Sequence, residues 1–402
     1  MLDPILPPYD IKAWRAAPLH ERLKMVCQAW AIQGYGTPPL IYTVYILKIA
    51  LLYVGGWCFW VSFTPGLGAP GEIASWAFTA VAFKKAVLWT LAYEGLGLGC
   101  GSGPLTGRYI PPIGGVLYFL KPGTTKLPFI EGPPIVGGSR RTRLDVVLYV
   151  LHYAFLVRAL MAPELTLGYL LPTVILLPIL SLSDKMIFLI SRAEHHFTAL
   201  VCFLFADQWL AGTKITWLAI WFWAATSKLN RHFPSVIAVM LSNSPFTRES
   251  FRKKLYRDFP NDLRPSKMAE WMAHIGTATE YTFPLLLLAG DGGALTVIGL
   301  VVMLGFHGFI TGNGPMGVPI EWNVIMVYGG FFLFGHHADV SVMTITQAPV
   351  LATYLAVVLV AVPLLGNLFP AYFSFLCAMR YYAGNWAYSV WLFRGESYRK
   401  LD

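Results

Sequence analysis

Charged residues are scarce in this chain of 402 residues: Asp, Glu, Lys and Arg make up 13% of it, whereas 56% of the residues are hydrophobic. A soluble domain carries about 25% charged residues. A water-soluble fold of this composition would expose large apolar patches, so a soluble globular enzyme, a disordered protein and a nucleic-acid-binding module are excluded. Lipid is the solvent that suits such a surface, and the composition predicts an all-α, polytopic membrane protein.

Cysteine is also rare, with 5 residues that form no CxxC pair. An odd number of cysteines, scattered through apolar stretches, argues against a disulfide framework or a zinc site. The sequence contains no P-loop, HExxH or CxxCH motif. It therefore gives no sign of a nucleotide or of a covalently bound haem.

Long apolar stretches are what the sequence has in abundance. A membrane-spanning helix needs ~20 predominantly apolar residues. About ten stretches meet or approach this length, at 40–63, 75–99, 144–161, 168–183, 187–206, 215–230, 268–290, 294–312, 320–337 and 348–370. We therefore expect a bundle of about ten spans.

The positions of the basic residues predict how this bundle is oriented. Lys and Arg are frequent in 1–39, 100–143, 231–267 and the C-terminal tail, whereas the alternate loops contain a single base, Lys214. The positive-inside rule then places both termini and every base-rich loop in the cytoplasm. The expected location is a cell membrane, taken as a bacterial inner membrane.

This layout divides the chain into three parts. We expect a cytoplasmic or interfacial segment at 1–39, a transmembrane domain at 40–370 and an aromatic, basic interfacial tail at 371–402. Membrane lipids are the expected partners, and nucleic acid is not.

One base-rich loop carries a more specific signal. The sequence PFTRESFRKKLYRDFPND predicts a short amphipathic helix with Phe246, Phe251 and Leu255 on one side and bases on the other. Such a helix suits anionic lipid headgroups.

Ionisable side chains inside the predicted spans are candidates for a functional site, because a charge at the bilayer centre costs at least ~2.5–3.5 kcal/mol. Seven of the nine histidines lie in or beside the later spans. A buried histidine can also simply bridge two helices by hydrogen bonds, so a structural role stays open for each. The conspicuous residues are Glu194, His195, His196, Lys228, His274, Glu280, His307, Glu321, His336 and His337.

Lys228 ends the sixth predicted span in the sequence SKLNRHF. One interpretation is a snorkelling lysine at the cytoplasmic boundary. The other is a desolvated amine, which acts as a base or nucleophile because burial disfavours its charged form.

The other candidates suggest local pairs and not a metal centre. His195 and His196 are adjacent, so their side chains leave a helix about 100° apart and are poorly placed to share one metal ion. Glu270 and His274 are four residues apart, which favours a pair on one helix face. We therefore expect no metal site.

Several of these motifs, in this order, resemble a known family. Residues 194–233 end in SKLNRHF, and TATEYTFPLLLL and PIEWNVIMVYGGF follow. They are similar to the membrane core of vitamin K-dependent gamma-carboxylases and of bacterial proteins with a horizontally transferred transmembrane domain. The similarity covers about residues 140–340. It implies that Lys228 is a base for a quinone-type molecule and that His195 or His196, with His307, lies in the pocket.

Two functions from different classes follow. The first is a membrane enzyme acting on an isoprenoid quinone or another lipid, with Lys228 as general base. In this hypothesis His196 and His307 are also catalytic, and the substrate is bound by His195, Glu280, Glu321 and His274. The alternative is a non-catalytic accessory subunit of a larger membrane protein complex, with the aromatic tail RYYAGNWAYSVWLF as a contact surface. A transporter ranks third because the sequence shows no internal repeat.

Overall fold

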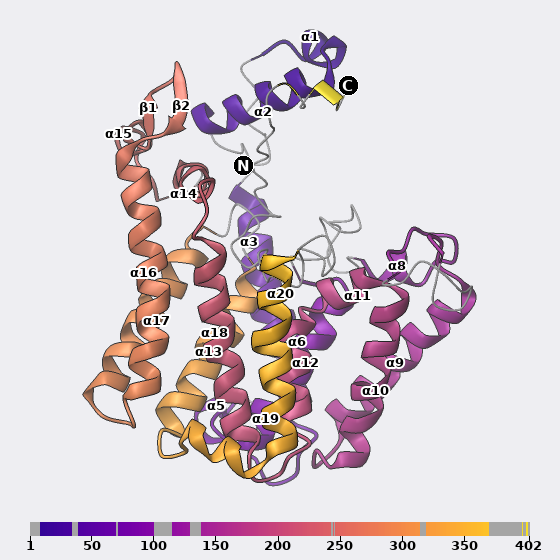
Figure 1. Cartoon of the computed structure of the whole chain (residues 1–402). Coiled ribbons are helices and arrows are strands. Elements are labelled where there is room, and N and C mark those ends of the chain that lie inside the picture. The colour runs from indigo at the N-terminus through magenta and orange to yellow at the C-terminus, as the bar shows by residue number, and fades with distance from the viewer. Residues whose placement is uncertain are drawn as a thin grey trace.

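The protein is described here by a computed structural model covering residues 9–33, 39–69, 71–99, 115–128, 138–242, 244, 246–313, 319–369, 396 and 399–400. Within these residues, helix occurs in each of the ten predicted ranges (Figure 1). The bundle consists of α3 (Pro39–Lys48) continued by η1 (Ile49–Val54) and α4 (Gly55–Val61), α6 (Ala80–Gly95), α9 (Arg143–Met161), α10 (Leu167–Ser183), α11 (Lys185–Ile190), α12 (Ala193–Cys202), α13 (Trp209–Ser227), α16 (Lys267–Ala289), α17 (Ala294–Thr311), α18 (Ile320–Gly330) continued by η3 (Phe331–His336), and α19 (Pro349–Ala356) continued by η5 (Val357–Ala361) and α20 (Val362–Leu368).

Shorter elements lie at the two ends of the bundle. The lower end in Figure 1 carries α5 (Ile73–Trp76) and η4 (Val342–Gln347). The upper end carries α1 (Ile11–Ala16), α2 (Leu19–Gln33), α8 (Val116–Phe119), α14 (Phe233–Ser242), α15 (Glu249–Lys254) and an antiparallel hairpin of β1 (Tyr256–Asp258) and β2 (Asp262–Pro265).

Four helical stretches are long and apolar enough to cross a membrane: Tyr42–Val61, Arg143–Met161, Ala294–Thr311 and Pro349–Leu368. Only 17–33% of the residues in their most apolar windows are buried. Leu51 and Val301, for example, are 68% and 64% exposed. Apolar residues that face outward need lipid around them, so the expectation of an all-α membrane protein is confirmed. The number of about ten crossings stays a prediction.

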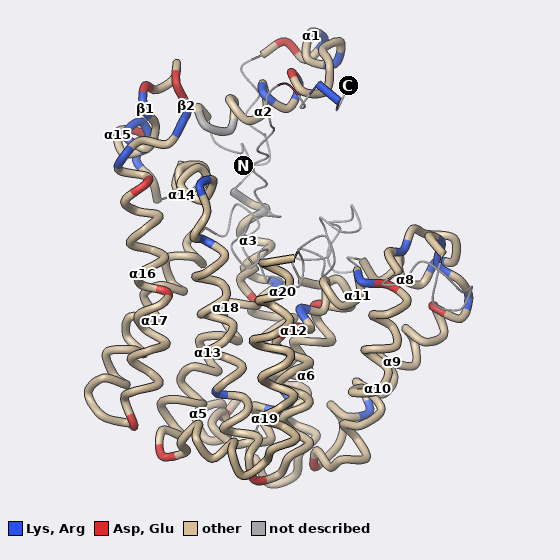
Figure 2. Tube along the Cα trace, viewed as in Figure 1, with Lys and Arg blue, Asp and Glu red and all other residues tan. Residues whose placement is uncertain are grey.

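The charges are distributed unequally between the two ends of the bundle. Lys and Arg gather mainly at the upper end (Figure 2). Each of the five lower connections, by contrast, contains one acidic residue and no base: Glu72, Glu164, Asp207, Asp291 and Asp339. Lys214, near the lower end, is turned inward and donates to the carbonyls of His337, at 2.7 Å, and Val340, at 2.5 Å. This asymmetry is what the positive-inside rule describes.

The asymmetry predicts which end faces the cytoplasm. Single cysteines at Glu164, in a lower connection, and at Lys253, on α15, should react from opposite sides of the membrane in a cysteine-free background. A membrane-impermeant maleimide should label Glu164→Cys in intact cells and Lys253→Cys only after lysis. Labelling of both positions from one side would contradict this orientation.

The predicted span at 187–206 is interrupted. Helix α11 ends at Ile190 and α12 begins at Ala193, because Arg192 has φ +45° and lies in the left-handed region. This conformation is strained for a residue other than glycine. The break turns the Arg192 side chain toward α6, where its Nε lies 3.0 Å from Oε1 of Glu94.

The predicted amphipathic helix in the 231–267 loop is only partly correct. Its helical part, α15, ends at Lys254, and the hairpin follows at once. The three apolar residues expected on one face are separated: Phe246 is 80% exposed, whereas Leu255 is fully buried against the α14 and α16 cluster. The apolar helix α14 in the same loop was not expected.

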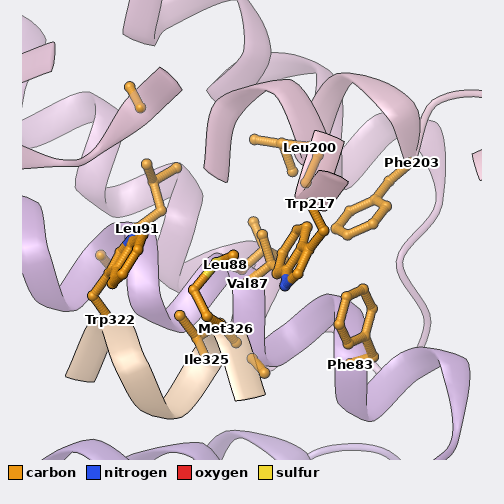
Figure 3. Close-up of a cluster of buried hydrophobic side chains, with 14 of the residues drawn as sticks. Phe83, Val87, Leu88, Leu91, Leu200, Phe203, Trp217, Trp322, Ile325 and Met326 are labelled. Carbon is orange, nitrogen blue, oxygen red and sulfur yellow. The ribbon is translucent and has the colours of Figure 1, made fainter. Parts of the chain in front are cut away.

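The centre of the bundle is formed by α6, α12, α13 and α18. Figure 3 shows Phe83, Val87, Leu88 and Leu91 of α6 facing these neighbours. The Phe83 ring stacks on that of Phe332 with centroids 4.2 Å apart. Aromatic pairs of this kind contribute about 0.5–1.5 kcal/mol beyond their burial. Helix α6 is therefore the central helix of the bundle.

Two buried ion pairs fasten the described part of the 100–143 loop to the bundle. Lys126 donates to Asp145 at 2.8 Å, and Nη2 of Arg141 lies 2.6 Å from Asp184. Burial raises the pKa of the Asp184 carboxyl, and the Arg141 guanidinium opposes this effect. Asp184 also accepts from the backbone N–H of Leu127 and Met186, so it organises the turn between α10 and α11.

The Arg141→Ala variant should be strongly destabilised, because Asp184 would remain buried without its cation. Removing one partner of a buried pair costs about 3–5 kcal/mol. The neighbouring Arg140 is exposed and bonded to the carbonyl of Gly123, so Arg140→Ala should change stability by less than about 1 kcal/mol. Denaturant unfolding in detergent measures both, and equal effects would contradict the assignment.

Candidate functional site

The first turn of α18 connects the polar groups inside the bundle. Oε2 of Glu321 accepts from the Tyr45 hydroxyl at 3.1 Å. The next residue, Trp322, donates from its indole to Nε2 of His195 at 3.0 Å. Consecutive helical residues point about 100° apart, so α18 reaches a different neighbour with each of these side chains.

His307 is held in one tautomer by two neighbours. Its Nε2 lies 3.1 Å from the Trp221 indole nitrogen, which can only donate. The proton of the neutral ring is therefore on Nδ1, which donates to Oδ1 of Asn323 at 2.7 Å. Asn323 is oriented in turn by its own bond to the carbonyl of Pro319. Because both ring nitrogens are engaged, His307 orients its surroundings, and a role as base would require one bond to break.

Lys228 is the residue that caps α13, and its side chain points into the bundle. It forms a buried ion pair with Glu280 of α16, with 9% and 2% of the two side chains exposed. Its ammonium group also lies 5.6 Å from the ring centroid of Phe306, which precedes His307 on α17. The structure thus differs from both sequence interpretations: Lys228 neither snorkels to the surface nor stands alone as a desolvated amine. The fold places the side chains of Lys228, Glu280 and His307 in one region of the bundle.

His195 and His196 lie on the other side of Trp322. Both are fully buried, and their ring centroids are 3.9 Å apart. Neither ring nitrogen of His196 has a hydrogen-bond partner among the described residues. His307 lies 6.0 Å and His195 lies 6.1 Å from Trp322, measured between ring centroids, so one indole separates the two histidine sites.

The sequence analysis missed the residues that surround Glu321. Neither Glu94 nor Arg192 was among the candidate residues. In the structure they form a buried ion pair, with side chains 0% and 3% exposed. The available signal was a charge in a spanning helix, which marks a functional candidate by default.

His274 does not join this site. It lies on the exposed face of α16, whereas Glu280 lies on the buried face. Its expected neighbour, Glu270, instead approaches Arg257 at 4.0 Å. His336 is the last residue of η3, which continues α18 away from its polar first turn, and both His336 and His337 have ring contacts with Phe332.

Within the described residues, no group of three or more His, Cys, Asp or Glu side chains could hold a metal ion. The site consists instead of two buried ion pairs, Lys228–Glu280 and Glu94–Arg192, with histidines between them. In an apolar bundle such groups can bind a polar headgroup or exchange a proton.

The fold and the outward apolar faces define the class: this is an integral, multi-pass α-helical membrane protein. More specifically, the chain belongs to a family described as transmembrane proteins of unknown function, DUF3556, whose sequence profile matches residues 1–402. No curated protein and no solved structure matches it.

The Lys228–Glu280 pair should behave as a coupled unit. Lys228→Met and Glu280→Gln should each lower the free energy of unfolding by about 3–5 kcal/mol, because one buried charge loses its partner. The double variant should lose less than the sum, since no buried charge remains. Denaturant unfolding in detergent measures this cycle. On the exposed Glu249–Lys253 pair of α15, Lys253→Met should cost less than about 1 kcal/mol. Additive losses at the buried pair would contradict the coupling.

Proposed function

We propose that this protein is a membrane enzyme of the bacterial inner membrane, with a carboxylase-like core that binds an isoprenoid quinone or another lipid with a polar headgroup. The observation that carries the proposal is the buried Lys228–Glu280 ion pair beside His307. Burying two charges in an apolar bundle costs free energy, so their presence here favours a functional role for the pair.

The pair suggests how Lys228 supplies a base. The ammonium of Lys228 transfers a proton to the carboxylate of Glu280, which leaves a neutral amine next to a neutral acid. The amine then accepts the proton of a hydroxyl group on the bound molecule. The products are a Lys228 ammonium, a protonated Glu280 and an oxyanion on the substrate, so protons and charge balance.

The surroundings support binding of a partly apolar molecule. Trp221, Phe283 and Phe306 pack around His307, with ring centroids 5.8–6.3 Å from the imidazole. Aromatic walls with a few convergent polar groups are typical of sites for small apolar ligands. His307, fixed by Trp221 and Asn323, would orient the headgroup.

A second candidate function is the accessory subunit of a larger membrane protein complex. A specific observation favours it: Lys228, His195 and His307 each already have a local partner. Groups satisfied in this way also serve to fix helix packing. In this proposal the polar interior is structural, and the function lies on the outer surface.

The test is native mass spectrometry with lipid extraction on gently solubilised protein. We expect wild type to carry a quinone or isoprenoid lipid, and the double variant Lys228→Met/Glu280→Gln to retain at least tenfold less of it. The double variant leaves no buried charge and is the form expected to stay folded. Lys253→Met, on the exposed pair, is the matched control and should retain the ligand.

The opposite result separates the two candidates. If wild type carries no small molecule but a stoichiometric partner protein, and if the double variant keeps this partner, the enzyme proposal fails. The result then supports the second candidate function, an accessory subunit of a larger membrane protein complex.

A further inference from the structure

The upper end of α17 marks one edge of the apolar layer around the bundle. This helix is one of the four that are long and apolar enough to cross a membrane, and Val301 and Phe309 on it are 64% and 45% exposed. Its 18 residues rise about 27 Å, close to the ~30 Å thickness of the hydrocarbon core of a bilayer. The backbone at its last residue, Thr311, therefore lies near the boundary between hydrocarbon and headgroups.

Two exposed aromatic side chains lie at this boundary. Phe246 is 80% exposed, and an added Cβ at Gly312 would lie 3.7 Å from Cε2 of its ring. Trp271 is 68% exposed on α16, which packs antiparallel to α17 (Figure 1). Trp271 lies 18 residues above Ala289, the end of α16, and Gly312 lies 18 residues above Ala294, the start of α17, so the two are at the same level. Tryptophan at this level is typical of a membrane–water interface.

The basic helix α15 is held just above these aromatic residues. Lys267, the first residue of α16, is four residues above Trp271, which is about 6 Å along a helix. The preceding Ser266 donates from its hydroxyl to the carbonyl of Lys254 at 2.6 Å, and from its backbone N–H to the carbonyl of Leu255 at 2.9 Å. The end of α15 is thus fixed beside the start of α16, at the level of the lipid headgroups.

The surface at this level has an excess of positive charge (Figure 2). Residues 246–271 contain seven basic and four acidic side chains, a net charge of +3. Three of the bases pair with acids: Lys253 with Glu249, Arg257 with Glu270 and Arg264 with Asp262. Arg248, Lys254 and Lys267 are also exposed, and they form no ion pair within the part of the chain that the structure describes. Three cations are therefore available to a ligand.

We infer that α15 and the start of α16 form a surface that binds anionic phospholipids of the surrounding bilayer. Phe246 and Trp271 contact the upper part of the acyl chains, and Arg248, Lys254 and Lys267 attract the phosphates. An acidic protein or a nucleic acid would match the charge of these bases. It would not match the exposed rings directly below them, which continue the lipid-facing surface of α17.

This surface goes beyond the proposed function, because it binds lipid outside the bundle and does not involve Lys228. It also differs from the amphipathic helix that the sequence predicts. Leu255 is buried in the protein and does not enter the membrane, and the apolar contacts come instead from Phe246 and Trp271, which belong to other segments. Because α15 is bonded to α16, the bases stay at the headgroup level without having to fold onto the membrane.

Native mass spectrometry of the purified protein, titrated with phosphatidylglycerol or phosphatidylcholine, tests the inference. We expect wild type to bind phosphatidylglycerol at least tenfold more tightly than phosphatidylcholine, because each base near an anionic headgroup adds about fivefold in affinity. The triple variant Arg248→Gln/Lys254→Gln/Lys267→Gln should lose at least tenfold in affinity for phosphatidylglycerol and keep its affinity for phosphatidylcholine. Trp271→Ala should weaken the binding of both lipids equally, because the ring contacts the part that they share.

The matched control is Lys12→Gln/Arg15→Gln/Lys24→Gln, which removes the same charge from exposed positions on α1 and α2 and should retain the preference. An equal loss in both triple variants would mean that net charge alone attracts the lipid, and the inference would be wrong. It would also be wrong if wild type did not distinguish the two lipids, or if the bases retained an acidic protein or a nucleic acid in their place. All substituted side chains are exposed, so thermal unfolding should be unchanged in each variant.

Discussion

The polar interior of this protein depends on the first turn of α18. Glu321, Trp322 and Asn323 follow one another in sequence, and each bonds to a different neighbour: Tyr45, His195 and His307. A buried polar group without a partner costs about 1–3 kcal/mol, so these three bonds together fix both the rotation and the depth of α18. A turn by one residue would leave all three unsatisfied.

Close packing of small residues completes the positioning of α18, as expected where lipid surrounds the helices. Apolar side chains gain little by leaving lipid for another helix, so small residues and polar bonds determine which helices meet. Gly329 lies against the indole of Trp217, and Gly330 against Met303, where a Cβ would come within 2.7 Å of several of their side-chain atoms. These two glycines let α18 approach α13 and α17 directly below the polar turn, so its lower half is positioned by contact and its upper half by hydrogen bonds.

The sequence predicted the helices well because long apolar stretches depend only on local composition. It predicted the site less well, because partners lie far apart: Glu94 meets Arg192 98 residues later, through a left-handed residue that no local pattern marks. The sequence alone could have excluded His274 from the site that contains Glu280. His274 lies six residues before Glu280, which is about 240° around a helix, so the two could not share a face. The carboxylase-like motifs drew attention to Lys228 but gave no indication that Glu280 would pair with it.

Buried ion pairs supply what hydrophobicity cannot supply in a membrane, a distinction between one apolar helix and the next. Each described buried pair joins separate segments: α6 to the α11–α12 break, α13 to α16, residues 115–128 to the start of α9, and residues 138–142 to the α10–α11 turn. A pair of this kind adds little net stability, because desolvation offsets the attraction between the charges. Mispairing, however, would strand two charges in lipid. The pairs therefore specify the arrangement of the helices, because every other arrangement would leave buried charges without partners. The geometry of a site built from these pairs is set by the same need to keep each buried charge paired.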